Sequence, residues 1–137
     1  MAPDVGALIL VVEDNRANLQ LAQALLRRAG YRVAEACSLL QARQVLKAQR
    51  PDLVLLDLGL PDGNGLELLP DLGGTPALAV SAYAMTEDRT RALAAGCVGF
   101  VTKPLNTRTF ATEVTGALVR TAQRGEGDTT VGPRAPH

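Results

Sequence analysis

The sequence predicts an α/β protein with the doubly wound, flavodoxin-like architecture (βα)5, in which helices cover both faces of a five-stranded parallel sheet ordered 2-1-3-4-5. Short apolar runs without polar alternation recur along the chain, which is typical of strands buried on both faces of a parallel sheet. Segments with apolar residues at helical spacing separate these runs. Strands that alternate with helices in this way favour a parallel sheet.

The first half of the chain holds two strand–helix units. An unbroken apolar run at residues 8–12 is the first predicted strand, and apolar residues at helical spacing over 19–29 predict the helix that follows. Gly30 is expected just past the end of that helix, where glycine tolerates the left-handed conformation. Residues 31–36 then predict a short strand, and residues 38–48 a helix whose opening serine is a natural cap.

The second half holds three more units. Its predicted strands are apolar runs, and its predicted helices are bounded by proline, glycine or an acidic first turn. The strands are residues 53–56, 77–80 and 98–102, and the helices are residues 66–72, residues 86–95 and an amphipathic helix that begins at residue 107. Residues 124–137 have nothing to bury and are predicted to form a disordered C-terminal tail.

Composition favours one cytoplasmic domain and excludes several classes of protein. The 137 residues suit a single domain, and 47% of them are hydrophobic, which supports a packed core without disulfides. The formal net charge of +0 gives no electrostatic argument for binding nucleic acid or an anionic membrane. No apolar run approaches the ~20 residues that span a bilayer, and the N-terminus lacks the basic region of a signal peptide.

Cysteine and histidine placement narrows the chemistry further. Cys37 and Cys97 have no metal-ligand spacing and are expected to be two buried free thiols in a reducing compartment. The single histidine, His137, is the last residue. The chain therefore offers no internal imidazole for a catalytic dyad, a zinc site or a phosphohistidine donor.

Polar side chains follow four of the five predicted strands. They are Glu13 and Asp14 after the first strand, Asp57 after the third, Ser81 after the fourth and Lys103 after the fifth. Because parallel strands end at the same edge, and these four strands are neighbours in the predicted order, the side chains are expected to meet in one cleft. Any one of them alone has a simpler structural explanation, as an acid that ends a strand or caps a turn. Their convergence favours a functional site.

Acids that are packed together repel one another, so the predicted cluster needs a compensating cation. Lys103 supplies one positive charge, and the remaining surplus suits Mg²⁺, a hard cation that prefers oxygen ligands and keeps several waters. Asp57 then has the chemistry of a nucleophile toward phosphorus. The metal and Lys103 would hold the phosphoryl oxygens during in-line displacement, and Ser81 and the backbone N–H of Ala82 would complete the grip.

Four motifs carry these residues: Val12-Glu13-Asp14-Asn15, Leu55-Leu56-Asp57 with Leu60-Pro61-Asp62-Gly63-Asn64-Gly65, Val80-Ser81-Ala82, and Thr102-Lys103-Pro104. In this order and spacing they resemble the receiver domains of two-component response regulators. The resemblance covers roughly residues 8–120 and implies one CheY-like receiver domain over residues 1–123. It also implies that Asp57 accepts a phosphoryl group from a phosphohistidine, with Glu13 and Asp14 in the Mg²⁺ site.

The resemblance implies finer features as well. In such domains the backbone carbonyl two residues after the acceptor also binds the metal, and that residue is Gly59 here. Mn²⁺ is an alternative to Mg²⁺. The resemblance also implies that the Lys103-Pro104 peptide bond is cis. Ser81 and Phe100 occupy the switch positions. The family usually has Tyr or His where this chain has Phe100. The inward rotamer of the Phe100 side chain is therefore expected even without phosphate. The alternative is that Phe100 is simply a core residue. Gly59 and Tyr83 lie where the family tunes its dephosphorylation rate.

The function that the resemblance implies is that of a stand-alone, DivK-type response regulator in a two-component system or phosphorelay. Its phosphoryl donor would be a sensor histidine kinase or a histidine phosphotransfer protein, and it would dephosphorylate itself without being an enzyme otherwise. Its output would reach a downstream protein partner through the fourth helix, fifth strand and fifth helix, or it would act as a phosphate sink. The same face would serve a homodimer, to which Arg89, Arg91 and Arg120 are candidate contributors. No nucleic acid or membrane is expected as a partner.

Two alternatives remain open at this point. One is a pseudo-receiver, an interaction module of the same fold that is never phosphorylated, and the intact set of polar residues argues against it. The other is an FMN protein or an aspartate-nucleophile phosphatase. A flavin phosphate would need a hydroxyl- and glycine-rich loop after the first strand instead of acids, and such a phosphatase would need a second acid where this chain has Gly59.

Overall fold

The computed structural model of the protein describes residues 6–82 and 86–131, with side chains for residues 6–82 and 87–120. In this part of the chain, five parallel strands form one sheet in the order β2-β1-β3-β6-β7. The strands are β1 (Leu8–Val12), β2 (Arg32–Ala36), β3 (Leu53–Asp57), β6 (Ala77–Ser81) and β7 (Gly99–Thr102). Counted along this sheet alone the order is 2-1-3-4-5, so the predicted fold class is confirmed.

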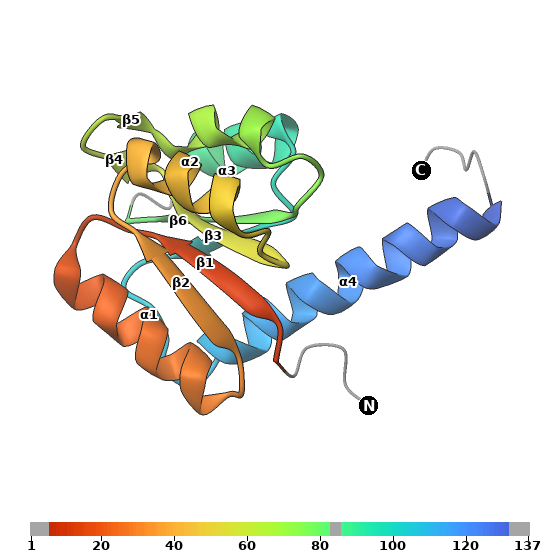
Figure 1. Ribbon diagram of the computed structural model, residues 1–137, viewed down its shortest axis with the longest axis horizontal. Helices are drawn as coiled ribbons and strands as arrows, with labels where there is room; N and C mark the ends of the chain where they lie inside the picture. The colour runs from red at the N-terminus through yellow and green to blue at the C-terminus, as the bar shows by residue number, and fades with distance from the viewer. Residues whose placement is uncertain (1–5, 83–85, 132–137) are drawn as a thin grey trace.

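Helices cover both faces of the sheet (Figure 1). On one face lie α1 (Arg16–Arg28) and the first part of α4 (Phe110–Val131), and on the other lie α2 (Leu39–Ala48), the 3₁₀ helix η1 (Gly65–Asp71) and α3 (Thr86–Ala95). None of the helices in the described part of the chain is long and apolar enough to cross a membrane.

The two faces bury separate cores because neighbouring residues of a strand point in opposite directions. In β1, Ile9 and Val11 pack with α1 and α4, whereas Leu10 and Val12 pack with α2, η1 and α3. Every residue of β3 is likewise buried. This burial on both faces explains why the central strands are unbroken apolar runs, whereas the edge strand β2 carries exposed Arg32 and Glu35.

Local hydrogen bonds set where the first two helices begin. Ser38 caps α2 as predicted, because its hydroxyl oxygen accepts a hydrogen bond from the backbone N–H of Gln41 at 3.1 Å. The side-chain oxygen of Asn15 does the same for α1, accepting from the N–H of Asn18 at 3.0 Å. Past the end of α1, Gly30 has φ 97°, in the left-handed region that glycine tolerates.

The segment after β3 differs from the prediction. Residues 66–72 were expected to form a short α-helix, but the structure has the 3₁₀ helix η1, which contains Pro70. Proline lacks the N–H of an α-helical hydrogen bond and collides with the preceding turn, which disfavours a regular α-helix here. Before η1, the two-residue strands β4 (Gly59–Leu60) and β5 (Gly63–Asn64) form a small antiparallel hairpin that the sequence did not predict.

Helix α4 is longer than predicted. A disordered tail was expected from residue 124, but the helix continues to Val131 and extends past the sheet (Figure 1). Phe110, Val114 and Ala117 anchor its first half in the core. Residues 132–137, the rest of the predicted tail, lie outside the described residues.

The two cysteines differ in exposure. Cys97 is buried and free, as predicted, but Cys37 is exposed, so the prediction of two buried thiols is wrong for Cys37. Cys37 lies in the loop between β2 and α2, where its Sγ donates a hydrogen bond to Oε1 of Gln41 at 3.0 Å. The loop runs over the surface, and its side chains have no core to enter.

Candidate functional site

The polar residues predicted to meet at the carboxyl edge of the sheet do lie together there. Asp57 and Ser81 are the last residues of β3 and β6, and Glu13 and Lys103 directly follow β1 and β7. The parallel register aligns these strand ends, since β3 pairs with both β1 and β6. Glu13, Asp57 and Ser81 are 5%, 4% and 4% exposed, whereas Asp14 is exposed.

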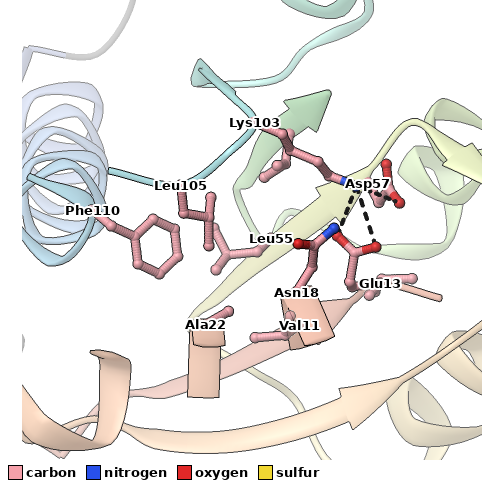
Figure 2. Close-up of a pocket in the computed structure, with 11 residues that line it drawn as sticks. Val11, Glu13, Asn18, Ala22, Leu55, Asp57, Lys103, Leu105 and Phe110 are labelled. Atoms are coloured by element: carbon pink, nitrogen blue, oxygen red, sulfur yellow. Dashed lines mark hydrogen bonds and ion pairs between the residues drawn. The ribbon is translucent and has the colours of Figure 1, made fainter. Parts of the chain in front are cut away.

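Lys103 reaches across the edge of the sheet to two of the acids. Its Nζ lies 2.9 Å from Oε1 of Glu13 and 3.1 Å from Oδ2 of Asp57 (Figure 2). The side chain of Lys103 is 15% exposed, so these ion pairs are largely withdrawn from water. Burial alone would lower the pKa of Lys103, but the hydrogen bonds and charges of Glu13 and Asp57 outweigh it and raise that pKa. Lys103 is therefore held firmly in its charged form.

Asp57 is held at both of its oxygens. Oδ2 accepts a hydrogen bond from Lys103, and Oδ1 accepts one from the backbone N–H of Gly59 at 3.1 Å. Burial nevertheless raises the pKa of Asp57, and the nearby charge of Glu13 adds to the rise, so that Gly59 and Lys103 do not fully compensate. The Asp57 carboxylate is thus not fully compensated for its removal from water.

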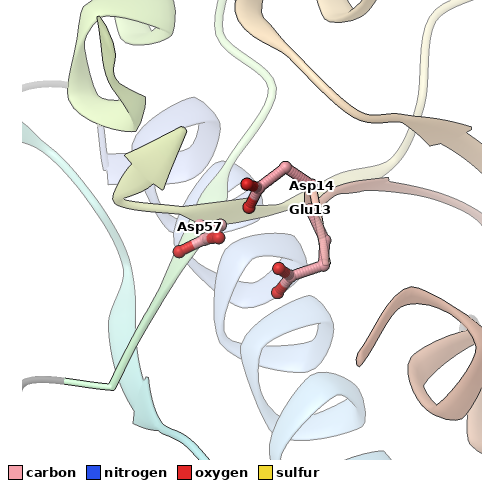
Figure 3. A group of neighbouring side chains, drawn as sticks. All are labelled: Glu13, Asp14 and Asp57. Atoms are coloured by element: carbon pink, nitrogen blue, oxygen red, sulfur yellow. The ribbon is translucent and has the colours of Figure 1, made fainter. Parts of the chain in front are cut away.

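Three carboxylates converge at the open end of this edge. One oxygen from each of Glu13, Asp14 and Asp57 lies within 4.8 Å of the others (Figure 3). Glu13 and Asp57 are buried while Asp14 is exposed, so the cluster is reachable from solvent on the Asp14 side. Several carboxylate oxygens beside open water are the donor set that Mg²⁺ or Mn²⁺ prefers, so these residues fit a hard divalent cation.

The surroundings explain why the acids are desolvated. Below them lies a cavity of about 20 Å³, whose walls are mainly apolar side chains from β1, α1, β3 and α4 (Figure 2). Val11, Ala22, Leu55 and Phe110 are among them. On the other side, a cleft of about 150 Å³ opens between the β3–η1 loop and α3 and includes Gly59 and Ser81 in its lining. The site is thus bounded by mainly apolar side chains underneath and opens into a cleft beside Asp57.

Backbone geometry ties the last two strands to the site. The backbone N–H of Lys103 donates to the carbonyl oxygen of Ser81 at 2.8 Å, which continues the pairing of β6 and β7 past their ends. The peptide bond between Lys103 and Pro104 is cis, in agreement with the expectation from the resemblance. Ala82 follows Ser81 and is exposed, and Tyr83 lies outside the described residues.

Sequence reasoning did not find two contacts of the loop that follows Asp57. A Cβ on Gly65 would overlap the backbone carbonyl oxygen of Asp57, so only glycine fits there. The carboxylate of Asp62 accepts hydrogen bonds from the first two backbone N–H groups of α2, at Leu39 and Leu40. The cluster of glycine, proline and aspartate predicted a tight loop, but the sequence had no signal for what the loop contacts.

Phe100 lies on β7 and is partly buried against the core on the α2, η1 and α3 face. The guanidinium carbon of Arg89, from α3, lies 5.1 Å from the centroid of the Phe100 ring, a cation–π arrangement. A phenylalanine offers no hydroxyl for a partner, so its position depends on packing and on this cation. The proposed switch role of Phe100 remains a prediction.

The fold and the site together define a class: an α/β protein with a buried aspartate at the end of its central strand, a lysine bound to it, and a cluster of carboxylates beside it. The family model of the response regulator receiver domain matches residues 9–115. The chain belongs to this family.

Individual relatives agree with this assignment. The polar-differentiation response regulator DivK of Brucella anthropi is 33% identical over 108 residues, which cover 74% of this chain and 88% of that protein. The CheY-like receiver domain protein of Methanospirillum hungatei has a crystal structure with a TM-score of 0.79 and 28% identity, over 87% of this chain and 98% of that one. The crystal structure of a response regulator receiver protein from Burkholderia phymatum has a TM-score of 0.75 and 31% sequence identity, over 82% of this chain and 95% of that one.

Receiver domains of two-component systems are phosphoacceptor signalling switches rather than conventional enzymes. They bind Mg²⁺ through an acidic pocket, and the cluster of Glu13, Asp14 and Asp57 is compatible with one. They interact with histidine kinases, phosphotransfer proteins and downstream targets.

Proposed function

We propose that this receiver is a DivK-like response regulator that accepts a phosphoryl group on Asp57. The supporting observation is the contact of Lys103 Nζ with both Asp57 and Glu13, beside the acidic cluster. The donor is a phosphohistidine on a sensor histidine kinase or a phosphotransfer protein. A carboxylate oxygen of Asp57 attacks phosphorus, the bond from phosphorus to the histidine nitrogen breaks, and that nitrogen keeps the electron pair. Water later hydrolyses the aspartyl phosphate, which releases inorganic phosphate and restores the carboxylate.

The chain's own groups position and stabilise the phosphoryl group. Lys103 and the N–H of Gly59 hold the two oxygens of Asp57 before the reaction, so the nucleophile is oriented in advance. After it, the ammonium of Lys103, the hydroxyl of Ser81 and the backbone N–H of Ala82 bind the phosphoryl oxygens. Donors that are already positioned where charge develops stabilise it without reorganisation at the moment of reaction.

The acidic cluster is the proposed cation site. Glu13, Asp14, Asp57 and the backbone carbonyl of Gly59 would hold Mg²⁺, with Mn²⁺ as an alternative. When bound, the metal neutralises charge on the acids and on the phosphoryl oxygens. The grouping of one oxygen from each of Glu13, Asp14 and Asp57 within 4.8 Å, with Lys103 contacting only Glu13 and Asp57, supports a cation here in addition to Lys103.

The output surface is proposed to be the face formed by α3, β7 and α4. Ser81 and Phe100 would act as the switch residues, with Ser81 drawn toward the phosphoryl group and the Phe100 ring repacking against α3. Leu93 on α3 is 44% exposed, and a groove lined in part by Phe100, Glu113 and Arg120 runs between β7 and α4. A downstream protein or a second copy of the chain in a homodimer would bind this face in the cytoplasm.

Intact mass spectrometry tests the proposal. The protein is mixed with Mg²⁺ and acetyl phosphate, beside an Asp57→Asn variant that keeps the shape of the side chain but removes the nucleophile. A labile phosphate adduct on the wild type alone is the expected result. Absence of an adduct, together with no stabilisation by Mg²⁺, would instead support the interaction module that is never phosphorylated.

A further inference from the structure

The hairpin that follows the acceptor begins with a residue of the proposed site. β4 and β5 pair antiparallel, with Gly59 opposite Asn64 and Leu60 opposite Gly63, which leaves Pro61 and Asp62 as the turn. Gly59 donates its N–H to Oδ1 of Asp57 at 3.1 Å. The position of the hairpin therefore sets the position of Gly59 relative to the acceptor.

Asp62 fastens the tip of this hairpin to helix α2. Its Oδ1 accepts a hydrogen bond from the N–H of Leu39 at 2.8 Å, and its Oδ2 accepts one from the N–H of Leu40 at 3.1 Å. These are the first two residues of α2, whose N–H groups have no partner within the helix and lie at its positive end. The N–H of Leu39, followed by that of Leu40, lowers the pKa of Asp62, so the carboxylate stays charged and bound.

The rest of the hairpin has little freedom to move on its own. Leu60 is buried in the core, and Gly63, with φ 147°, lies close enough to Leu39 that a Cβ would come within 2.9 Å of the leucine Cδ1. The N–H of Gly65 donates to the carbonyl oxygen of Leu58 at 3.1 Å, which closes the loop at its base. The loop is thus closed at its base and fastened at its tip to α2.

We propose that Asp62 is a positioning residue for the phosphoacceptor site: it holds the β4–β5 hairpin against α2, so that the Gly59 N–H supports Asp57 and the Gly59 carbonyl is placed for Mg²⁺. This inference rests on the proposed function for its metal, but not for the position of Gly59. A plain helix-capping role is the competing explanation, because the same two hydrogen bonds also stabilise the start of α2.

Ser38 supplies a matched control. It caps the same turn of α2 by accepting from the N–H of Gln41, yet its side chain has no hydrogen bond to the hairpin among the described residues. Ser38→Ala therefore weakens the start of α2 without releasing the hairpin, whereas Asp62→Ala does both. Asp62→Asn tests rescue, because its amide oxygen can still accept from one of the two N–H groups.

The experiment compares the four proteins by ¹⁵N NMR, first without metal and then in a Mg²⁺ titration. Asp62→Ala is expected to shift the Gly59 amide resonance and to weaken Mg²⁺ binding about tenfold, the lower range for residues that orient a metal ligand. Ser38→Ala is expected to lower stability without changing either readout. Asp62→Asn is expected to give effects on the Gly59 amide and on Mg²⁺ binding between those of the wild type and Asp62→Ala.

Equal effects of Asp62→Ala and Ser38→Ala, or an unmoved Gly59 amide in Asp62→Ala, would overturn the positioning role. A wild type that binds no Mg²⁺ would overturn the proposed metal site, while the metal-free Gly59 amide still decides the role of Asp62.

Discussion

At the scale of single residues, the site depends on one lysine shared between two buried acids. Lys103 contacts both Glu13 and Asp57, and each of these acids is at most 5% exposed. Withdrawing a carboxylate from water costs several kcal/mol unless an opposite charge and hydrogen bonds compensate it. Lys103 therefore stabilises the folded protein as well as the proposed phosphoryl group.

Replacing Lys103 measures how much this side chain contributes to the stability of the folded protein. Lys103→Met keeps most of the side-chain length but leaves two buried acids without their cation, so the free energy of unfolding is expected to fall by about 1–3 kcal/mol at neutral pH. Urea unfolding without divalent cations measures this, and added Mg²⁺ is expected to restore part of the loss. The control is Lys47→Met, at an exposed position in the last turn of α2. Equal stability of the two variants would contradict the argument.

The two thiols are predicted to differ sharply in reactivity. Burial raises the pKa of the Cys97 thiol to about 11, whereas Cys37 is exposed. Since the thiolate is the reactive form, at pH 8 iodoacetamide is expected to modify Cys37 rapidly and Cys97 only after unfolding. Mass spectrometry of native and urea-treated samples checks this, and Cys37→Ser should remove the fast reaction. Rapid labelling of Cys97 in the folded protein would show that the core opens far more often than its packing indicates.

At the scale of elements, the loop between β3 and η1 is built around a close backbone approach. Gly65→Ala would place a methyl group on the carbonyl oxygen of Asp57, so the end of the strand that carries Asp57 must shift. A loss of about 1–3 kcal/mol in the free energy of unfolding is expected, as for other overpacked positions. Slower phosphorylation by acetyl phosphate should accompany it.

Gly59→Ala is the stability control for this loop. Its added Cβ would meet no atom within 4 Å, and its φ lies outside the left-handed region, so the free energy of unfolding should change by less than about 0.5 kcal/mol. If Gly59→Ala and Gly65→Ala destabilise the protein equally, the cause is the loss of glycine flexibility in the loop and not the contact with Asp57.

Elements with a strong local pattern could be predicted from the sequence, and elements that depend on distant contacts could not. Strands buried on both faces leave unbroken apolar runs, and Ser38 marks the start of α2, so these predictions held. The β4–β5 hairpin is two residues long on each side and has no hydrophobic period to detect. The attachment of Asp62 to α2 joins residues more than twenty positions apart, which no local pattern reveals.

At the scale of the whole molecule, the parallel topology is what assembles the site. Four strands of the sheet deliver their last or next residue to one edge, although those residues are spread from Glu13 to Lys103 along the chain. The sequence could predict this convergence because alternating strands and helices favour a parallel sheet, and five such units in a chain of this length fit the doubly wound order 2-1-3-4-5. It could not predict the extent of burial, which leaves Asp14 exposed while Glu13 and Asp57 lie inside. That difference depends on how the neighbouring helices pack.

Asp14 is the best probe of the proposed cation, because it is the exposed member of the cluster whereas Glu13 and Asp57 are buried. Because Asp14→Asn removes one of three mutually repelling carboxylates, the metal-free variant is expected to be at least as stable as the wild type. A ligand that binds only the folded state stabilises it by about 2.7 kcal/mol at a hundred times its dissociation constant. Mg²⁺ should therefore raise the melting temperature of the wild type, and the rise should shrink in Asp14→Asn but persist in Glu87→Gln, an exposed acid of α3 outside the cluster. The same rise in all three proteins would mean that Mg²⁺ acts through general ionic screening, because removing a ligand must weaken a specific site.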